Sequence, residues 1–223
     1  MTASRVCFNM PDIKYTDISE ACRYMGCSGE PDEKVRALAE QYAERVEKAA
    51  RPAYIFKPID SLLYEKILVG EDIKRHVEGC SEIILFAATL GVGVDSLIRR
   101  ESALSAAGAL AADAAASACI EGFCRAADRE LQRRFEGKYL TWRYSPGYGD
   151  MPLAVQKEIT TVLDAEKRLG LTLTESLTMI PMKSVTAVIG VSEERLGNRS
   201  AGCSVCNMRD SCEFRKKGDI CGL

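Results

Sequence analysis

The chain has 223 residues, 47% of them hydrophobic, which is enough for one large domain with a buried core, or for such a domain with a small appendage. Its formal net charge of −2 gives no reason to expect nucleic acid or an anionic membrane surface as a partner. Residues 1–20 carry several charged side chains and no apolar segment of the kind found in secretory signals, so we expect a cytoplasmic protein.

The first half of the chain contains signals for both helices and strands. Residues 32–50 place apolar side chains at helical spacing behind a Pro-Asp start. Residues 52–59 predict a short strand bounded by prolines, and residues 81–91 predict a buried strand. A helix is expected at 93–100.

An alanine-rich segment without proline follows at residues 102–136 and predicts one long helix that ends at Gly137. It is too weakly apolar, and too interrupted by Asp113, to predict a membrane span. We interpret it as a helix whose small side chains let neighbouring elements approach closely.

The second half of the chain alternates short strand and helix signals. Residues 138–144 alternate like a strand, and Asp150 is placed to cap a following helix that ends before Gly170. Residues 173–191 predict two strands around a turn at Pro181. Because strands and helices mix without a regular βαβ alternation, the predicted fold class is α+β.

Two weak motifs are better explained by structure than by chemistry. "LGVGVDS" at 90–96 lacks the third glycine of a dinucleotide-binding loop, so it favours a plain strand-to-helix turn. His76 is the single histidine, which excludes a multi-histidine metal site. Corrinoid-binding proteins place an aspartate two residues before a cobalt-ligating histidine, whereas Lys74 stands here. We therefore predict that His76 is a surface residue of a helix.

The segment "RYSPGYGDMP" at 143–152 combines residues that restrict or widen the backbone conformation with side chains that can bind a ligand. Prolines fix φ and glycines permit unusual conformations, so the segment predicts a shaped loop. Arg143 offers a planar cation and Tyr148 an aromatic ring. These residues alone fit a ligand site and a rigid turn equally well.

Together with the segments after it in the chain, this loop resembles the activation (reactivation) domain of cobalamin-dependent methionine synthase. That family has an R-x-A-P-G-Y loop, a helix, an L-T-E-S-x-x-M-x-P segment and an S-V-S-G strand in the same order. Here "RYSPGY", "LTESLTMIP" and "SVTAV" occupy those places. The resemblance spans about residues 117–191. It implies a twisted, mainly antiparallel sheet flanked by helices, and we expect a domain over residues 1–198.

The resemblance also implies a site for S-adenosylmethionine. Arg143 and Tyr148 match the family's loop arginine and tyrosine. Ser145 replaces the family's alanine, and Gly147 lies between Ser145 and Tyr148 in the chain. Glu121, in "CIEGF", matches the family's helix glutamate. A guanidinium suits the ligand's carboxylate, a tyrosine ring its sulfonium, and Glu121 its ammonium. The family's tyrosines after the last strand are missing from "EERLGN".

The function implied is reductive methylation of cob(II)alamin, with S-adenosylmethionine as methyl donor. No corrinoid module fits in this chain, so the cobalamin is expected on a separate corrinoid methyltransferase or a split methionine synthase. An electron donor such as flavodoxin or ferredoxin would act with it. The alternatives are an S-adenosylmethionine-dependent methyltransferase with a small-molecule acceptor, and an iron–sulfur electron-transfer or docking module.

A cysteine-rich tail at residues 199–223 is expected as a second unit. Cys203, Cys206, Cys212 and Cys221 are spaced C-x2-C-x5-C-x8-C, and four thiolates this close can hold one metal centre. The spacing differs from the paired C-x2-C of a zinc ribbon, so an iron–sulfur cluster is favoured. Zinc, free thiols and a disulfide remain as alternatives.

Overall fold

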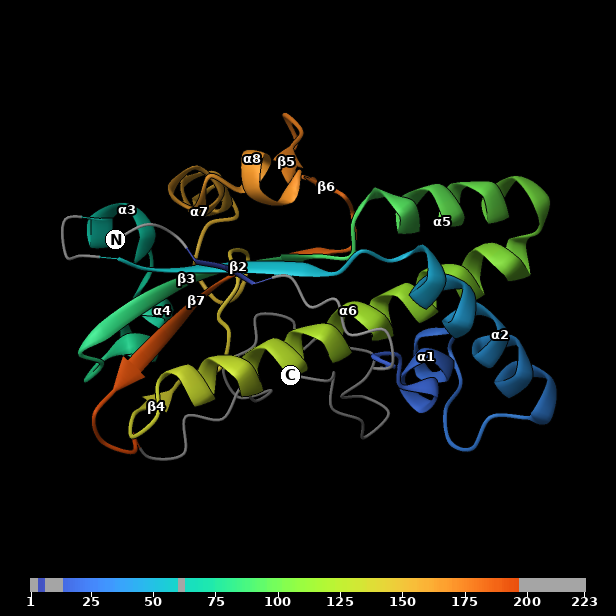
Figure 1. Cartoon of the computed structure of the whole chain (residues 1–223), viewed down its shortest axis with the longest axis horizontal. Helices are drawn as coiled ribbons and strands as arrows, with labels where there is room; N and C mark the ends of the chain where they lie inside the picture. Colours follow the sequence, from blue (N-terminus) through green and yellow to red (C-terminus); the bar gives the residue numbers. More distant parts are fainter. Residues whose placement is uncertain (1–3, 7–13, 60–62, 197–223) are drawn as a thin grey trace.

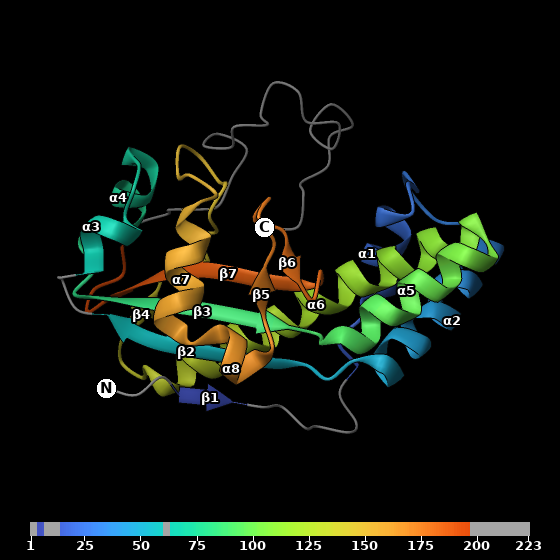
Figure 2. The same cartoon turned by 90° about the horizontal axis from the view of Figure 1, so that it is seen from above.

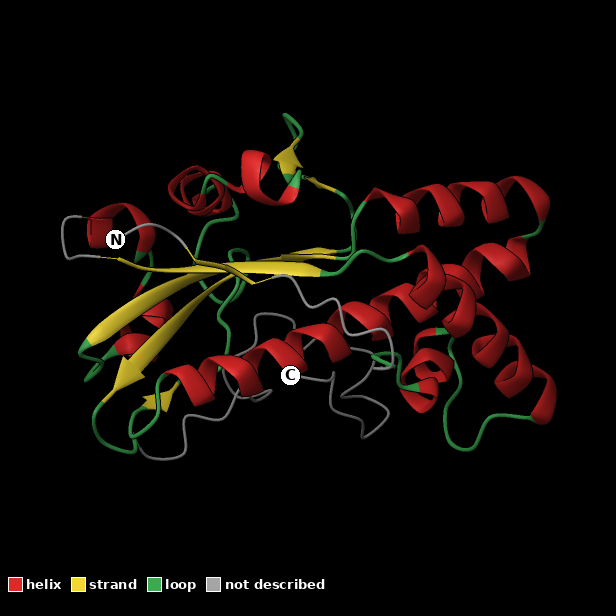
Figure 3. Cartoon of the chain, in the orientation of Figure 1, coloured by secondary structure: helices red, strands yellow, loops and turns green. Residues whose placement is uncertain are grey.

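The computed structural model describes residues 4–6, 14–59 and 63–196. Its main sheet has five strands, and each strand is antiparallel to its neighbour (Figure 3). In spatial order the strands are β1 (Ser4–Val6), β2 (Ala53–Ile59), β3 (Glu82–Thr89), β7 (Ser184–Ser192) and β4 (Tyr139–Leu140). With helices against both faces, this confirms the predicted α+β class and the mainly antiparallel sheet.

The central strand β3 is apolar on both faces because both faces are covered. Its even-numbered Ile84 and Phe86 belong to one core cluster, and its odd-numbered Ile83 and Leu85 to another. This alternation follows from the period of two in a strand. A continuous apolar run such as "EIILFAAT" is therefore the expected sequence of a strand between two helical layers.

One layer lies against the even-numbered face of β3 and continues past the end of the sheet. The long helix α6 crosses this face, and three other helices pack around it (Figure 1). These helices are α1 (Ile18–Tyr24), α2 (Glu33–Ala49), α5 (Val92–Leu104) and α6 (Ala106–Arg134).

The other layer is made of shorter elements. Figure 2 shows α7 crossing the strands, with α8 and a two-stranded hairpin beside it. The elements of this layer are α3 (Tyr64–Ile67), α4 (Glu71–Val77), α7 (Val155–Leu163), α8 (Ala165–Leu169), β5 (Thr172–Leu173) and β6 (Met179–Ile180).

The prediction of one helix over residues 102–136 was wrong at its start. Ser105 adopts extended backbone (φ −162°, ψ 132°), which ends α5 at Leu104 and lets the chain reverse. The Ser105 hydroxyl then accepts a hydrogen bond from the Gly108 N–H at 3.2 Å and caps α6. Gly137, with φ of 81°, follows the end of α6 as expected.

Helix α6 is a core helix built from small residues. In the described part of the chain it is the helix that is long and apolar enough to cross a membrane, by length and composition only, and 67% of its most apolar window is buried. A Cβ at Gly122 would collide with the backbone oxygen of Tyr15. The small side chains therefore permit the close approach that the sequence predicts.

Most of the other predicted elements are confirmed, with shifted ends. The single helix predicted before Gly170 is instead broken into α7 and α8 at Asp164, where φ is 53°. The Asp32 side chain caps α2 by accepting from the Val35 N–H at 2.9 Å. Past α6, the strand predicted over 138–144 forms only β4 and a single bridge between Tyr144 and Val188. Of the two strands predicted around Pro181, the second is confirmed as β7. The first was wrong, because the β5–β6 hairpin with strands of two residues each stands in its place.

Candidate functional site

The loop that follows β4 is fixed at its first residues to the middle of strand β7. The Tyr144 N–H donates to the Val188 oxygen at 2.9 Å, and the Val188 N–H donates back to the Tyr144 oxygen at 2.8 Å. Extended backbone here sends consecutive side chains to opposite faces. Arg143 therefore meets α6, whereas Tyr144 joins the core on the other face.

Arg143 lies between two carboxylates of α6. Its Nη2 donates to Glu121 Oε2 at 3.4 Å, and its Nη1 is 3.5 Å from Asp128 Oδ2. The Arg143 side chain is only 16% exposed. Its Nη1 is buried and makes no hydrogen bond within the described structure. A buried guanidinium with unused hydrogen-bonding capacity suits an anionic group of a ligand.

Burial controls the charges of the groups around Arg143. It raises the pKa of both Glu121 and Asp128 above the ordinary carboxyl values, and the neighbouring guanidinium opposes that rise. Between them on α6, burial raises the pKa of the Cys124 thiol to about 12. Cys124 is therefore a neutral core thiol, unsuited to nucleophilic or metal chemistry at neutral pH.

The next residues form a tight turn with internal hydrogen bonds. The Tyr148 N–H donates to the Ser145 oxygen at 3.1 Å, and the Gly147 N–H donates to the Met151 oxygen at 2.9 Å. Gly147 has φ of 93° and Gly149 has φ of 53°, both in the left-handed region. A Cβ at Gly149 would also collide with the Tyr144 hydroxyl. The glycines of the motif are therefore required by the backbone.

Aromatic rings support this turn from the side opposite α6. The Tyr148 ring, 39% exposed, lies with its centroid 6.4 Å from Trp142 and 6.0 Å from Tyr144. Trp142 in turn packs on His76 at 4.5 Å. Burial raises the pKa of Tyr144 to about 12, so its phenol is neutral.

The prediction that His76 is a surface residue was wrong. His76 is on a helix, α4, but it is only 6% exposed, and its Nε2 lies 2.9 Å from the Trp142 oxygen. Its partner is 66 residues away in sequence, so the helical pattern around it could not indicate this contact.

Asp150 was predicted to cap the helix that follows the loop, and this was also wrong. Its carboxylate accepts from the Glu71 N–H at 2.7 Å and from the Asp72 N–H at 3.0 Å, so it caps α4 instead. A Cβ at Gly70, where φ is 119°, would collide with Asp150. The end of the loop is thereby tethered to α4, and α7 begins only at Val155.

The described structure brings together Arg143 and Glu121, with Ser145, Gly147 and Tyr148 in the adjoining turn. Asp128 is an additional member that the sequence did not predict. It lies seven residues after Glu121, which places both on one face of α6, and this spacing was the signal that could have found it.

The predicted metal ligands Cys203, Cys206, Cys212 and Cys221 lie outside the described residues. Within residues 4–6, 14–59 and 63–196, no group of three or more histidine, cysteine, aspartate or glutamate side chains could hold a metal ion.

Comparison with known proteins places this site in a family context. The family model for the vitamin B12 dependent methionine synthase activation domain matches residues 73–196, more than half of the chain. The crystal structure of the MetH reactivation domain bound to AdoHcy has a TM-score of 0.61 and 18% sequence identity to this chain. The match covers 98% of this chain and 86% of that chain, and it shows a shared fold. A search of curated proteins gave no match.

The tether at Asp150 predicts a pH-dependent loss of stability in Asp150→Ala. The two backbone hydrogen bonds hold the pKa of Asp150 below its ordinary value. A lowered folded-state pKa stabilises the protein above the unfolded value of about 4, and this contribution disappears as pH falls through the folded value. Urea unfolding should therefore show Asp150→Ala less stable than wild type at neutral pH, with a difference that shrinks in acid.

Asp150→Asn is the matched control, because it keeps an acceptor oxygen but loses the charge. It should fall between the wild type and Asp150→Ala at neutral pH. A difference between wild type and Asp150→Ala that stays constant with pH would contradict the assigned tether.

Proposed function

We propose a function from one established premise: the chain belongs to the vitamin B12 dependent methionine synthase activation domain family. The proposed ligand is S-adenosylmethionine, bound between the loop at 143–151 and α6. The proposed role is reductive methylation of cob(II)alamin that is carried by a separate corrinoid methyltransferase or a split methionine synthase. The AdoHcy named in the related crystal structure supports this ligand class.

The observation that carries the proposal is the buried Nη1 of Arg143, which makes no hydrogen bond in the described structure. A carboxylate at this point would take charge-assisted hydrogen bonds from the guanidinium. Glu121 and Asp128 would then turn toward the ligand's ammonium group. Two carboxylates thus lie within reach of one ammonium group, and one guanidinium lies within reach of one carboxylate, which matches the charged groups of an amino acid.

The turn after Arg143 supplies the remaining contacts. Tyr148 offers a partly exposed ring, and aromatic faces attract cations such as a sulfonium. Ser145 and Gly147 present backbone groups beside it. We assign the turn to ligand binding rather than to bracing alone, because a bracing tyrosine needs no exposed face.

The position of the loop fits methyl transfer to a partner protein. S-adenosylmethionine supplies the methyl group, and a donor such as flavodoxin or ferredoxin supplies the single electron. The chain's own residues hold the ligand and leave it accessible, since Gly147 and Tyr148 are both exposed. A methyl group held where a docked corrinoid protein can reach it reacts within one complex. No separate collision between free S-adenosylmethionine and the cobalamin is then needed.

The tail is proposed as a second unit over residues 199–223, after a domain at 1–198. The support is the C-x2-C-x5-C-x8-C spacing of Cys203, Cys206, Cys212 and Cys221. An iron–sulfur cluster held there would place a redox centre on the protein that takes part in a one-electron reaction. Zinc is the alternative, and would make the tail a structural unit only.

Removal of the guanidinium should weaken ligand binding. In calorimetric titrations with S-adenosylmethionine, Arg143→Ala should lose about 1.5–3 kcal/mol of binding free energy, the worth of hydrogen bonds to a charged group. Arg133→Ala is the matched control, because that arginine is on the last turn of α6 with a 72% exposed side chain. Unchanged affinity in Arg143→Ala would remove Arg143 from the site.

The proposed role predicts methylcobalamin formation only in a complete mixture. The mixture contains this protein, a corrinoid protein loaded with cob(II)alamin, a reductant and S-adenosylmethionine. Absorbance spectra should show methylcobalamin when all four are present and none when any one is omitted. Equally fast formation without this protein would refute the role, and methylation of a small acceptor without the corrinoid protein would favour the methyltransferase alternative.

The tail predicts bound iron in anaerobically purified protein. The preparation should be brown and contain iron and acid-labile sulfide in similar amounts. Cys206→Ser should lose both, whereas Cys27→Ser, at a half-buried thiol on the main domain, should keep both. A colourless protein with bound zinc would refute the redox role and keep the metal site.

A further inference from the structure

A second candidate site lies in a hollow of about 410 Å³ between α2 and α5. Three of its lining side chains are cations and none is acidic. The others are small, except for one leucine, so they leave the space open. The lining residues are Arg45, Lys48, Ala49, Gly93, Ser96, Leu97 and Arg100.

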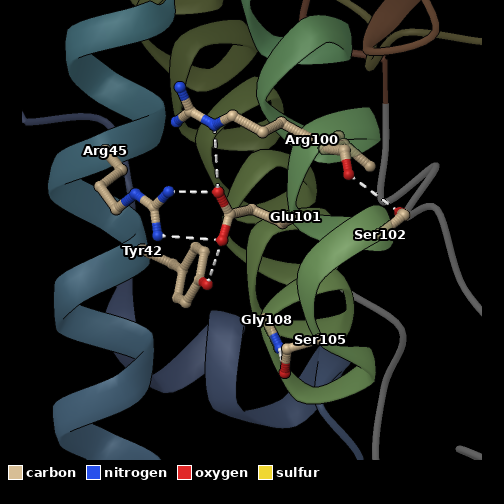
Figure 4. A network of polar contacts seen from close by, with 8 residues as sticks. Tyr42, Arg45, Arg100, Glu101, Ser102, Ser105 and Gly108 are labelled. Atoms are coloured by element: carbon tan, nitrogen blue, oxygen red, sulfur yellow. Dashed lines mark hydrogen bonds and ion pairs between the residues drawn. The ribbon is translucent and has the colours of Figure 1, made fainter.

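Two of the cations are held in place by a buried carboxylate. Glu101 is only 4% exposed and accepts from the Tyr42 hydroxyl at 2.7 Å. Both terminal nitrogens of Arg45 also bind it, and Arg100 Nε approaches at 3.4 Å (Figure 4). Hydrogen bonds from Tyr42 and Arg45 keep the pKa of Glu101 below its ordinary value. Arg45 is therefore positioned by a charged carboxylate before any ligand arrives. Arg100, whose side chain is 64% exposed, is held by the same carboxylate more loosely.

The cations exceed the negative charge that is available to them. Glu101 balances only one of the two guanidiniums. Lys48 lies 3.8 Å from Glu44 in a pair whose side chains are 80% and 63% exposed, and such pairs are weak. Two positive charges thus remain without firm compensation at one hollow.

Helix ends of both signs border the hollow. The 13-residue helix α5 begins here, and its N-cap, Gly91, makes no side-chain capping bond. Asp95 in the first turn offsets part of the positive end of the α5 dipole, but its carboxylate accepts from the Met182 N–H and it does not line the hollow. At the end of α2, where the dipole is negative, the carbonyl oxygens of Lys48 and Ala50 accept from Arg51.

We propose that this hollow binds the phosphate dianion of a small phosphorylated molecule. A dianion matches the two positive charges in excess, and guanidiniums match phosphate oxygens through paired hydrogen bonds. The volume has room for the molecule that bears the phosphate. The hollow shares no residue with the loop at 143–151, so the proposal stands independently of S-adenosylmethionine binding.

The test uses inorganic phosphate and pyrophosphate as probes on the full chain at constant ionic strength. Binding is followed by calorimetry and by the backbone amide resonances of Gly93 and Ser96. Wild type should saturate, and Lys48→Gln/Arg100→Gln should bind about tenfold more weakly or worse because two charge-assisted contacts are lost. Thermal unfolding of the variant checks that it is folded, and Lys48→Gln alone, at an 80% exposed side chain, gives a milder second test.

Arg99→Gln is the matched control, because Arg99 is an exposed neighbour on α5 that does not line the hollow. It should change the affinity by less than about twofold, the range of an exposed charge. An equal loss in this control, or no saturation by either probe, would overturn the proposal. Saturation by a tetraglutamate peptide but not by phosphate would also overturn it, and would assign the hollow to an acidic protein partner.

Discussion

The close packing of α6 against α1, α2, α5 and the segment before α1 is the constraint on which the described structure depends. Small residues of α6 permit this approach, and at Gly122 the backbone of Tyr15 occupies the place of a side chain. Because Gly122 must face Tyr15, this packing helps to fix which residues of α6 face the loop. Glu121 and Asp128 are therefore presented to Arg143 by the core itself, and the candidate site inherits the rigidity of the interior.

The loop at 143–151 joins the two layers of the molecule. Strand-like alternation sends Arg143 toward α6 and Tyr144 toward the opposite core. Asp150 then binds the start of α4, in the layer that also contains His76. A ligand bound by this loop would contact the layer of α6 directly. The layer of α4 would hold the loop in position. A site on such a junction is held by the sheet between the layers, not by the loop alone.

Features of the structure that depend on residues close in sequence were predicted correctly. Predictions were wrong where contacts with residues distant in sequence determine the structure. The Asp32 cap and the buried strand β3 were recognisable because spacing of a few residues determines them. Asp150 looked like a cap for the next helix, yet its partners are 78 and 79 residues away. The exposure of His76 was predicted wrongly for the same reason, because its partner Trp142 is 66 residues away. Of the site, the loop residues Arg143 and Tyr148 were recognisable from their motif, whereas Asp128 required knowing which face of α6 turns toward the loop.

Local charge, not net charge, distinguishes the two candidate sites. The near balance of acidic and basic residues over the chain suggested no charged partner. Yet Arg143 is in direct contact with two carboxylates, whereas three cations line the hollow between α2 and α5. The Arg143 side chain is only 16% exposed, and the low dielectric there strengthens interactions with a ligand of opposite sign. At the hollow, Lys48 and Arg100 are 80% and 64% exposed, so solvent screens their charges more. A global balance therefore coexists with two candidate sites of different charge, one proposed for a sulfonium compound and one proposed for a phosphate.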